Sequence, residues 1–381
     1  MRVRIKNIVL LLSFVMFFKL TACRTDEPVH KSETETKEEG DSLAVVKGFY
    51  LLNEGNMGSN KASLDYYSYI TGIYSRNIFA ERNPNVTKEL GDVGNDLKIY
   101  GSKLYAIINC SNLVEVMDAV TGIHIATIEI PNCRYICFNK DKAYVSSYAG
   151  PVQIGNKQLG FVAEIDTATL QITRNVTVGY NPEEMAIIDN KMYVANSGGY
   201  LVPDYDNTLS IIDLDSFTEI KKVEVAINMH RVRADKYGDL YLSTRGDYYT
   251  MPANLFLFDV ETQTIKKTFD IPVGNMCIVG DSAYLYSVGF NWNTGLDEIS
   301  YALIDIKSEE VLSRSFIADG TESLIKLPYG IAVNPNNKEI FVTDAGDYVS
   351  PGTLYCFDKA GYLKWKQTTG DIPAHIEFTF K

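Results

Sequence analysis

The chain has 381 residues, 46% of them hydrophobic and 22% charged, a composition that can bury a core and is not that of a disordered protein. A net charge of −12 argues against a nucleic-acid partner, because binding to phosphates requires a basic surface. Four histidines in the whole chain disfavour a multi-histidine metal centre, and we predict neither a metal site nor a resident cofactor.

The chain begins with a basic segment followed by the apolar run 8–18. Eleven residues of helix are too short to cross the hydrocarbon core of a bilayer, so this pattern indicates a signal sequence rather than a membrane span. The segment Leu20-Thr21-Ala22-Cys23 resembles a bacterial lipobox. We therefore predict that residues 1–22 are a lipoprotein signal peptide and that Cys23 is lipidated. An ordinary secretory signal with an incidental cysteine is the alternative.

Residues 23–44 are predicted to be a flexible tether, because residues 24–43 hold seven acidic residues and no aromatic one. The early pair Asp26-Glu27 resembles the export signal of surface lipoproteins in Bacteroidetes. This resemblance implies that the protein is anchored by lipid in the outer membrane and exposed at the cell surface.

Residues 45–381 contain a repeated pair of short strands. The first is built around an aromatic residue, as in Leu104-Tyr105-Ala106-Ile107 and Met192-Tyr193-Val194-Ala195. The second ends in an aspartate at positions 118, 166, 213, 259, 305 and 358, with spacings of 48, 47, 46, 46 and 53 residues. We expect the repeated tyrosines to pack between sheets and the aspartates to cap the turns that follow them.

A third, alternating strand and a fourth, apolar strand complete each unit, for example at 220–225 and 329–333. Seven units of about 48 residues match the length of propeller blades. The first unit begins at its aromatic strand and has no inner, apolar strand before it, whereas the C-terminal segment 375–380 is an alternating strand with no unit after it. The sequence predicts an all-β, seven-bladed β-propeller closed by a C-terminal strand that completes the first blade, with two separate β-domains as the alternative.

Long loops between the aromatic strand and its partner carry most of the remaining polar and aromatic residues. In a propeller these loops emerge on one face, and such loops on a rigid scaffold usually form the binding surface. Three loops are similar, each placing a tyrosine soon after the strand and a proline at its return. The predicted ligand-binding residues are Asn53, Asn109, Tyr148, Asn196, Tyr200, Arg245, Tyr248, Phe290, Trp292, Asp344 and Tyr348. The alternative is that single loop tyrosines only pack the loops against one another.

Catalytic motifs are missing from the sequence: it has no Gly-x-Ser-x-Gly, Walker or His-Glu-x-x-His pattern. The acid pair Glu183-Glu184 is interpreted as a solvated loop end. The segment 204–207 lacks the glycine and the final glutamate of an EF-hand loop, so it is weak evidence for calcium. Cys110 and Cys133 both fall near the loop face, and a disulfide between them is possible in an oxidising compartment.

The blade repeat resembles the broad group of YncE-like and YVTN propellers. The segment 51–60 (LLNEGNMGSN), the segment Leu90-Gly91-Asp92 and the lipobox are similar to BtuG-type lipoproteins of gut Bacteroidetes. That resemblance implies a surface propeller that is not an enzyme, captures cobalamin or a related corrinoid and delivers it to a TonB-dependent outer-membrane transporter. A propeller that binds a glycan or another large polar ligand, a lactonase-like or lyase-like propeller enzyme, and an adhesion or scaffold module remain as alternatives.

Overall fold

The computed structural model describes residues 34–36, 46–86, 90–291 and 296–380. All of them belong to one compact unit, residues 32–381. Within this part of the chain, no helix is both long enough and apolar enough to cross a bilayer. Cys23 and the predicted signal peptide lie outside the described residues, as does nearly all of the predicted tether.

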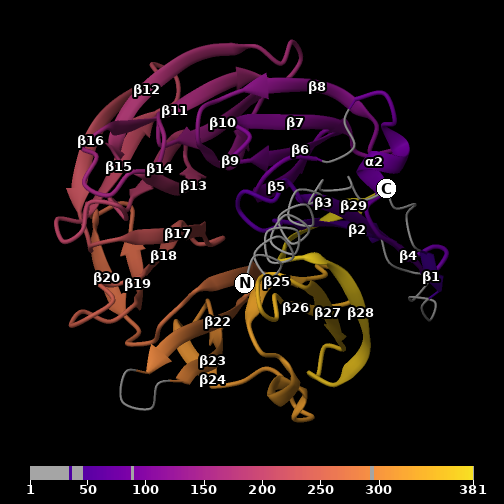
Figure 1. Cartoon of the computed structure of the whole chain (residues 1–381). Helices are drawn as coiled ribbons and strands as arrows, with labels where there is room; N and C mark the ends of the chain where they lie inside the picture. The colour runs from indigo at the N-terminus through magenta and orange to yellow at the C-terminus, as the bar shows by residue number, and fades with distance from the viewer. Residues whose placement is uncertain (1–33, 37–45, 87–89, 292–295, 381) are drawn as a thin grey trace, which may run out of the picture. The chain divides into compact units, whose positions relative to one another are not determined.

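The described strands form seven antiparallel sheets arranged as the blades of a β-propeller, which confirms the predicted fold (Figure 1). From the axis outward, blade 1 comprises β29 (Pro373–Phe380), β2 (Val46–Asn53), β3 (Ser63–Ser68), β4 (Ile73–Ser75) and β1 (Thr34–Thr36). Blade 2 comprises β5 (Gly94–Tyr100), β6 (Lys103–Ile108), β7 (Leu113–Asp118) and β8 (His124–Glu129). Blade 3 comprises β9 (Cys133–Asn139), β10 (Lys142–Ser147), β11 (Leu159–Asp166) and β12 (Ile172–Tyr180).

The remaining blades follow in chain order. Blade 4 comprises β13 (Pro182–Ile188), β14 (Lys191–Asn196), β15 (Thr208–Asp213) and β16 (Thr218–Glu224). Blade 5 comprises β17 (Met229–Ala234), β18 (Asp239–Thr244), β19 (Asn254–Asp259) and β20 (Thr264–Thr268). Blade 6 comprises β21 (Asn275–Val279), β22 (Ser282–Asn291), β23 (Leu296–Asp305) and β24 (Glu310–Ser313). Blade 7 comprises β25 (Pro328–Val333), β26 (Ile340–Asp344), β27 (Pro351–Phe357) and β28 (Leu363–Asp371). Two short helices, α2 (Ile78–Arg82) and η1 (Thr321–Leu324), lie in connections between blades.

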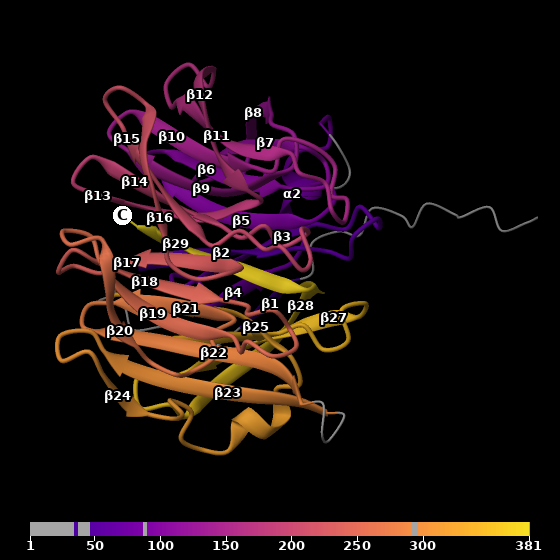
Figure 2. The same cartoon turned by 90° about the vertical axis from the view of Figure 1, so that its left-hand side faces the viewer.

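The C-terminal strand closes the ring as predicted. β29 pairs antiparallel with β2, with Leu51 opposite Ile376 and Phe49 opposite Phe378. In the side view the yellow β29 lies beside the indigo β2, although the two come from opposite ends of the sequence (Figure 2). β29 also contacts the inner strands β25 and β5 of the two neighbouring blades, so it continues the inner ring of strands. Blade 1 thereby gains the inner strand that its own part of the chain does not supply.

One part of the tether prediction is wrong. Residues 34–36 fall in the segment predicted to be unfolded, but they form β1 and pair with β4, with Glu35 opposite Tyr74. Without β1, strand β4 would be the outer edge of blade 1, with unpaired backbone groups. An extended segment close in sequence can satisfy these groups without any apolar pattern of its own, so composition alone did not reveal it.

Both predicted structural repeats are confirmed. Tyr105, Tyr144, Tyr193 and Tyr241 are buried, and each packs in an apolar cluster shared by two neighbouring blades. The aspartates cap the turns after their strands: Asp118 Oδ1, for example, accepts hydrogen bonds from the backbone N–H groups of residues 120 and 121 at 3.1 and 2.8 Å. Equivalent bonds are made by Asp166, Asp213, Asp259, Asp305 and Asp358. These residues therefore build the scaffold and leave the loop face to supply a site.

Candidate functional site

A broad cleft of about 1250 Å³ opens on the predicted loop face and extends over blades 1 to 4. Its lining includes Glu54 and Met57 from blade 1, Asn109 and Asn112 from blade 2, Tyr148 from blade 3 and Tyr200 from blade 4. These residues lie in the loops between the second and third strands of their blades, or directly after the second strand. Because the strands are antiparallel and the blades are equivalent, these loops all emerge on the same face. We call this space the loop-face cleft.

A smaller pocket of about 300 Å³ lies where the inner strands begin, and we call it the axial pocket. It is bounded by three arginines, Arg134, Arg231 and Arg245, together with His230 and Tyr286. Four residues line both spaces: Glu54, Val93, Arg134 and Tyr329. The axial pocket is therefore continuous with the loop-face cleft.

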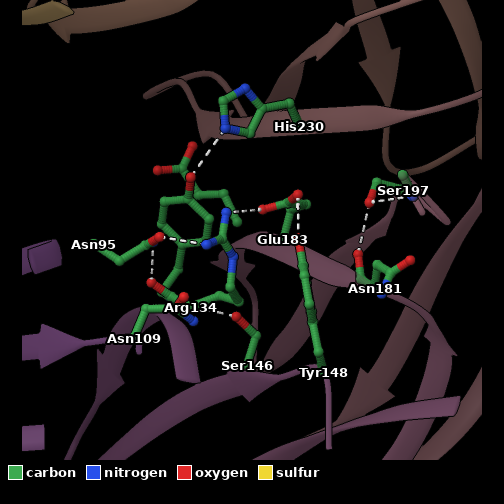
Figure 3. Close-up of polar contacts among 12 residues, drawn as sticks. Asn95, Asn109, Arg134, Ser146, Tyr148, Asn181, Glu183, Ser197 and His230 are labelled. Atoms are coloured by element: carbon green, nitrogen blue, oxygen red, sulfur yellow. Dashed lines mark hydrogen bonds and ion pairs between the residues drawn. The ribbon is translucent and has the colours of Figure 1, made fainter. Parts of the chain in front are cut away.

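Glu183, on β13, is the centre of a buried polar network between the cleft and the axis (Figure 3). Its Oε1 accepts hydrogen bonds from the Tyr148 hydroxyl at 2.6 Å and from Arg245 Nη1 at 2.9 Å. Its Oε2 lies 3.2 Å from Arg134 Nη2. Burial by itself would raise the pKa of Glu183, but the charges of Arg134 and Arg245 lower it to about 2. Glu183 is therefore a fixed anion at neutral pH.

The interpretation of Glu183-Glu184 as a solvated loop end is wrong, because both side chains are buried. Glu184 Oε1 lies 2.9 Å from Arg233 Nη2, and its Oε2 accepts a hydrogen bond from the backbone N–H of Val232 at 3.0 Å. The compensating arginines come from β9, from β17 and, for Arg245, from the loop after β18, about 50–60 residues away in the sequence. The residues next to Glu183 and Glu184 in the sequence therefore do not indicate that the two carboxylates are paired and buried.

His230 and Tyr135 share a hydrogen bond of 2.9 Å between the imidazole Nε2 and the phenol oxygen. Burial and the surrounding arginine charges, Arg245 first among them, hold the pKa of His230 well below its usual value. Burial also raises the pKa of Tyr135. Both groups are therefore neutral polar partners in the wall of the axial pocket.

Several predicted site residues do lie at these two spaces. Asn109, Tyr148 and Tyr200 line the loop-face cleft, and Arg245 and Tyr348 line the axial pocket. Tyr148 is buried, and the rings of Tyr148 and Tyr200 meet edge to face with centroids 6.2 Å apart. Tyr248 is exposed on the same face but lies in the lining of neither space.

Three predicted residues instead lie beneath the loops and hold them in place. Asn53 is fully buried and donates to Ser63 Oγ at 3.1 Å. Asn196 is also fully buried, accepts from the backbone N–H of Gly179 and donates to Ser210 Oγ. Asp344 accepts from the backbone N–H groups of residues 326 and 327. A polar residue at a strand end looks the same in sequence whether it faces a ligand or a loop backbone, and for these three the structure favours the second role.

Trp292 and the side chain of Phe290 lie outside the described residues. The described cysteines, Cys110 and Cys133 included, are free thiols. Asp206, in the segment weighed for calcium, instead accepts hydrogen bonds from the backbone N–H groups of Tyr180 and Thr208. Among the described residues no acidic, histidine or cysteine cluster of metal-binding size is found.

The sequence reasoning missed the residues around the axis. Asn95, Arg134, Glu183, His230 and Tyr329 each occupy the second position of an inner strand. Closing the ring brings these equivalent positions from different blades together. An alignment of the repeats through the inner strand, instead of the aromatic strand, would have pointed to this ring of polar side chains.

Comparison with solved structures supports the propeller fold at low sequence identity. The chain is similar to a hypothetical selenium-binding protein from Sulfolobus tokodaii, with 11% identity, a TM-score of 0.62 and coverage of 88% of this chain and 94% of the other. It is also similar to a quinoprotein alcohol dehydrogenase-like protein from Bacteroides thetaiotaomicron (16% identity, TM-score 0.55, coverage 88% and 79%). A third similar structure is the hydrazine synthase of Kuenenia stuttgartiensis (15% identity, TM-score 0.55, coverage 70% and 76%).

No curated protein matches the sequence. A family match covers most of the propeller, from the second residue of β2 to within β28. Through residues 47–367 the chain belongs to the family described as a domain of unknown function, DUF5074.

Proposed function

We propose that this protein captures a corrinoid such as cobalamin in the loop-face cleft and delivers it to a TonB-dependent outer-membrane transporter. The observation that carries the proposal is the size and lining of the cleft. At about 1250 Å³ it exceeds the range of roughly 300–1,000 Å³ that is common for drug-sized ligands. A ligand that fills it is large, and a corrin is wide, nearly flat and rimmed with amides.

The chemistry of the lining supports this choice. Asn109, Asn112 and Asn132 line the cleft together with the rings of Tyr148 and Tyr200. The amides of Asn109 and Asn132 shape this wall: Asn109 Nδ2 donates to Asn132 Oδ1 at 2.6 Å, and Asn132 Nδ2 donates to the carbonyl of Gly150 at 2.8 Å. The Nδ2 group of Asn112 can donate to an amide carbonyl of the ligand, and tyrosines offer large contact area at low side-chain entropy. A glycan would use similar groups, and it is included in the test below for that reason.

We further propose that the protein binds its ligand without changing it. Two titratable groups of the polar network between the cleft and the axis have fixed charge states: Glu183 is held as an anion by two arginines, and His230 is held neutral. A general acid or base works best with a pKa near the operating pH, and neither group meets that condition.

The loop tips around the cleft fit delivery to a second protein. Met57, Ile154, Tyr249, Met251 and Val349 are all more than half exposed, and they come from loops of blades 1, 3, 5 and 7. Exposed apolar side chains beside a ligand site can contact a second protein that approaches the site. This rim surrounds the site that a transporter would have to approach.

Titration of the purified protein with cyanocobalamin, and separately with a panel of plant glycans, tests the function directly. We expect saturable binding of cyanocobalamin and recovery of the ligand unchanged. Replacing Tyr200 or Tyr348 by alanine should weaken the binding by about 30-fold, as expected for the loss of a central aromatic contact. The melting temperature should change little, because both side chains are partly exposed.

Tyr362→Ala is the matched control, since Tyr362 is also exposed but lies in the turn between β27 and β28 on the opposite face. Normal cyanocobalamin binding by the Tyr200→Ala, Tyr348→Ala double variant would contradict the site. Binding of a glycan alone would replace the corrinoid proposal, and a chemically altered ligand would contradict binding without chemistry.

The lipid anchor is proposed together with this function. Cells expressing the full chain should present it to external protease, and Cys23→Ala should release it from the membrane fraction, because the acyl chains would then be missing. Metabolic labelling with a fatty-acid probe, followed by fractionation, measures both effects. Unchanged membrane retention of Cys23→Ala, or protection of the wild type from protease on intact cells, would count against the anchor or its orientation.

A further inference from the structure

The arginines around the axis outnumber the carboxylates that hold them. Glu183 is shared by Arg134 and Arg245, at 3.2 and 2.9 Å. Glu184 is shared by Arg231 and Arg233, at 3.7 and 2.9 Å. Each glutamate therefore neutralises only one of two guanidinium groups.

Arg231 is the least satisfied of the four. Its side chain is only 9% exposed, and its Nη1 lies 3.7 Å from Glu184, too far for a hydrogen bond. Its Nε has no hydrogen-bond partner among the described residues, and its guanidinium lies over the ring of Tyr135 at 5.3 Å. The oxygens of Glu184 already bond Arg233 and the backbone N–H of Val232. A buried guanidinium without acceptors is costly, so this position favours an acceptor from outside the chain.

The axial pocket places that acceptor site at the inner end of the loop-face cleft. Arg134, Arg231 and Arg245 all line it. The carboxylates facing the same space are Glu54, which lines the pocket and accepts from the Tyr329 hydroxyl at 2.8 Å, and Glu183 behind the arginines. His375 also lines it, with Nε2 3.4 Å from Glu54 Oε1.

We propose that the axial pocket is a subsite for one oxyanion group of the captured ligand, bound by Arg231. The planar fork of arginine pairs with phosphate or carboxylate through two parallel hydrogen bonds. At about 300 Å³ the pocket holds such a group but not a corrin ring, so the ligand body stays in the cleft while its anionic arm reaches the axis. This inference rests on the proposed function and narrows it to corrinoids that keep the phosphodiester of their nucleotide loop.

The experiment compares cyanocobalamin, which has this phosphodiester, with dicyanocobinamide, which lacks it. The wild type should bind cyanocobalamin more tightly. Arg231→Gln should weaken cyanocobalamin binding by at least about 10-fold, the effect of losing a charge-assisted hydrogen bond, and should leave dicyanocobinamide binding within about 3-fold. Arg174→Gln is the matched control, because Arg174 lies on the outer strand β12 and pairs with Glu164. It should leave the binding of both corrinoids unchanged.

The outcomes separate the subsite from the function. Equal binding of the two corrinoids by the wild type, or an equal loss of both in a folded Arg231→Gln variant, would overturn the subsite while leaving corrinoid capture intact. If neither corrinoid binds, the proposed function fails, and sodium phosphate becomes the probe. It should then raise the melting temperature of the wild type but not of Arg231→Gln. An equal effect of phosphate on both proteins would overturn the subsite as well.

If Arg231→Gln does not fold, Arg231→Lys is the second variant, because it keeps the charge but loses the planar fork of donors. It should show the same selective loss of cyanocobalamin binding.

Discussion

Deleting residues 374–381 should abolish cooperative folding near room temperature. The deletion removes almost all of β29, which pairs with β2 from Val46 to Asn53, and each lost ladder bond costs about 0.5–1.5 kcal/mol net. It also removes Phe378, whose ring packs 6.0 Å from Phe49 and 5.9 Å from Phe341, and Ile376 of the same cluster. The sum is comparable to the typical domain stability of about 5–15 kcal/mol.

Circular dichroism during heating measures the effect. Phe380→Ala is the control, because Phe380 is exposed at the end of β29 and its loss should shift the melting temperature little. A synthetic peptide of residues 373–381, added to the truncated protein, should restore part of the transition by refilling the inner position of blade 1. A truncated protein that melts like the wild type would contradict closure by the C-terminal strand.

Glu183→Gln should destabilise the protein by about 3–5 kcal/mol at pH 7, the usual cost of removing one partner of a buried ion pair. The amide keeps the shape of the side chain but leaves Arg134 and Arg245 without their shared carboxylate. Urea denaturation at pH 7 measures the loss. Glu261→Gln is the control, since Glu261 is exposed in the turn between β19 and β20.

The same carboxylate predicts a pH dependence with a defined sign. The pKa of Glu183 in the folded protein is about 2, below its ordinary value of 4.5, so its contribution to the free energy of unfolding is complete above pH 4.5. It amounts to roughly 3 kcal/mol and is lost as the pH falls from 4.5 toward 2. The stability difference between wild type and Glu183→Gln should therefore shrink over that interval. A difference that stays constant down to pH 3 would contradict the charged network.

The strand repeat and its closure could be predicted because they depend on local patterns. In an aromatic strand such as that around Tyr193, the alternation of apolar and polar residues itself indicates which side chains are buried. Asp118 caps the turn that directly follows its own strand. The regular spacing of these features set the number of blades. The unpaired strand at 375–380 indicated how the ring closes. The loop face followed from the fold, which is why Tyr148 and Tyr200 could be assigned to one surface before their positions were known.

The polar centre of the molecule was decided only by the tertiary structure. Arg134, Glu183 and His230 lie about 50 residues apart in sequence, and they meet because equivalent positions of successive inner strands converge on one axis. Whether a glutamate such as Glu183 is solvated or buried depends on arginines from other blades. The residues around Glu183 in the sequence do not indicate that these arginines will lie beside it. The same reason explains Asn53 and Asn196, whose strand-end positions resemble those of ligand contacts but whose amides bond neighbouring loops and strands. Strand periodicity can be recognised from neighbouring residues in the sequence. The pairing of buried charges cannot, because the partners meet only when the ring of blades closes.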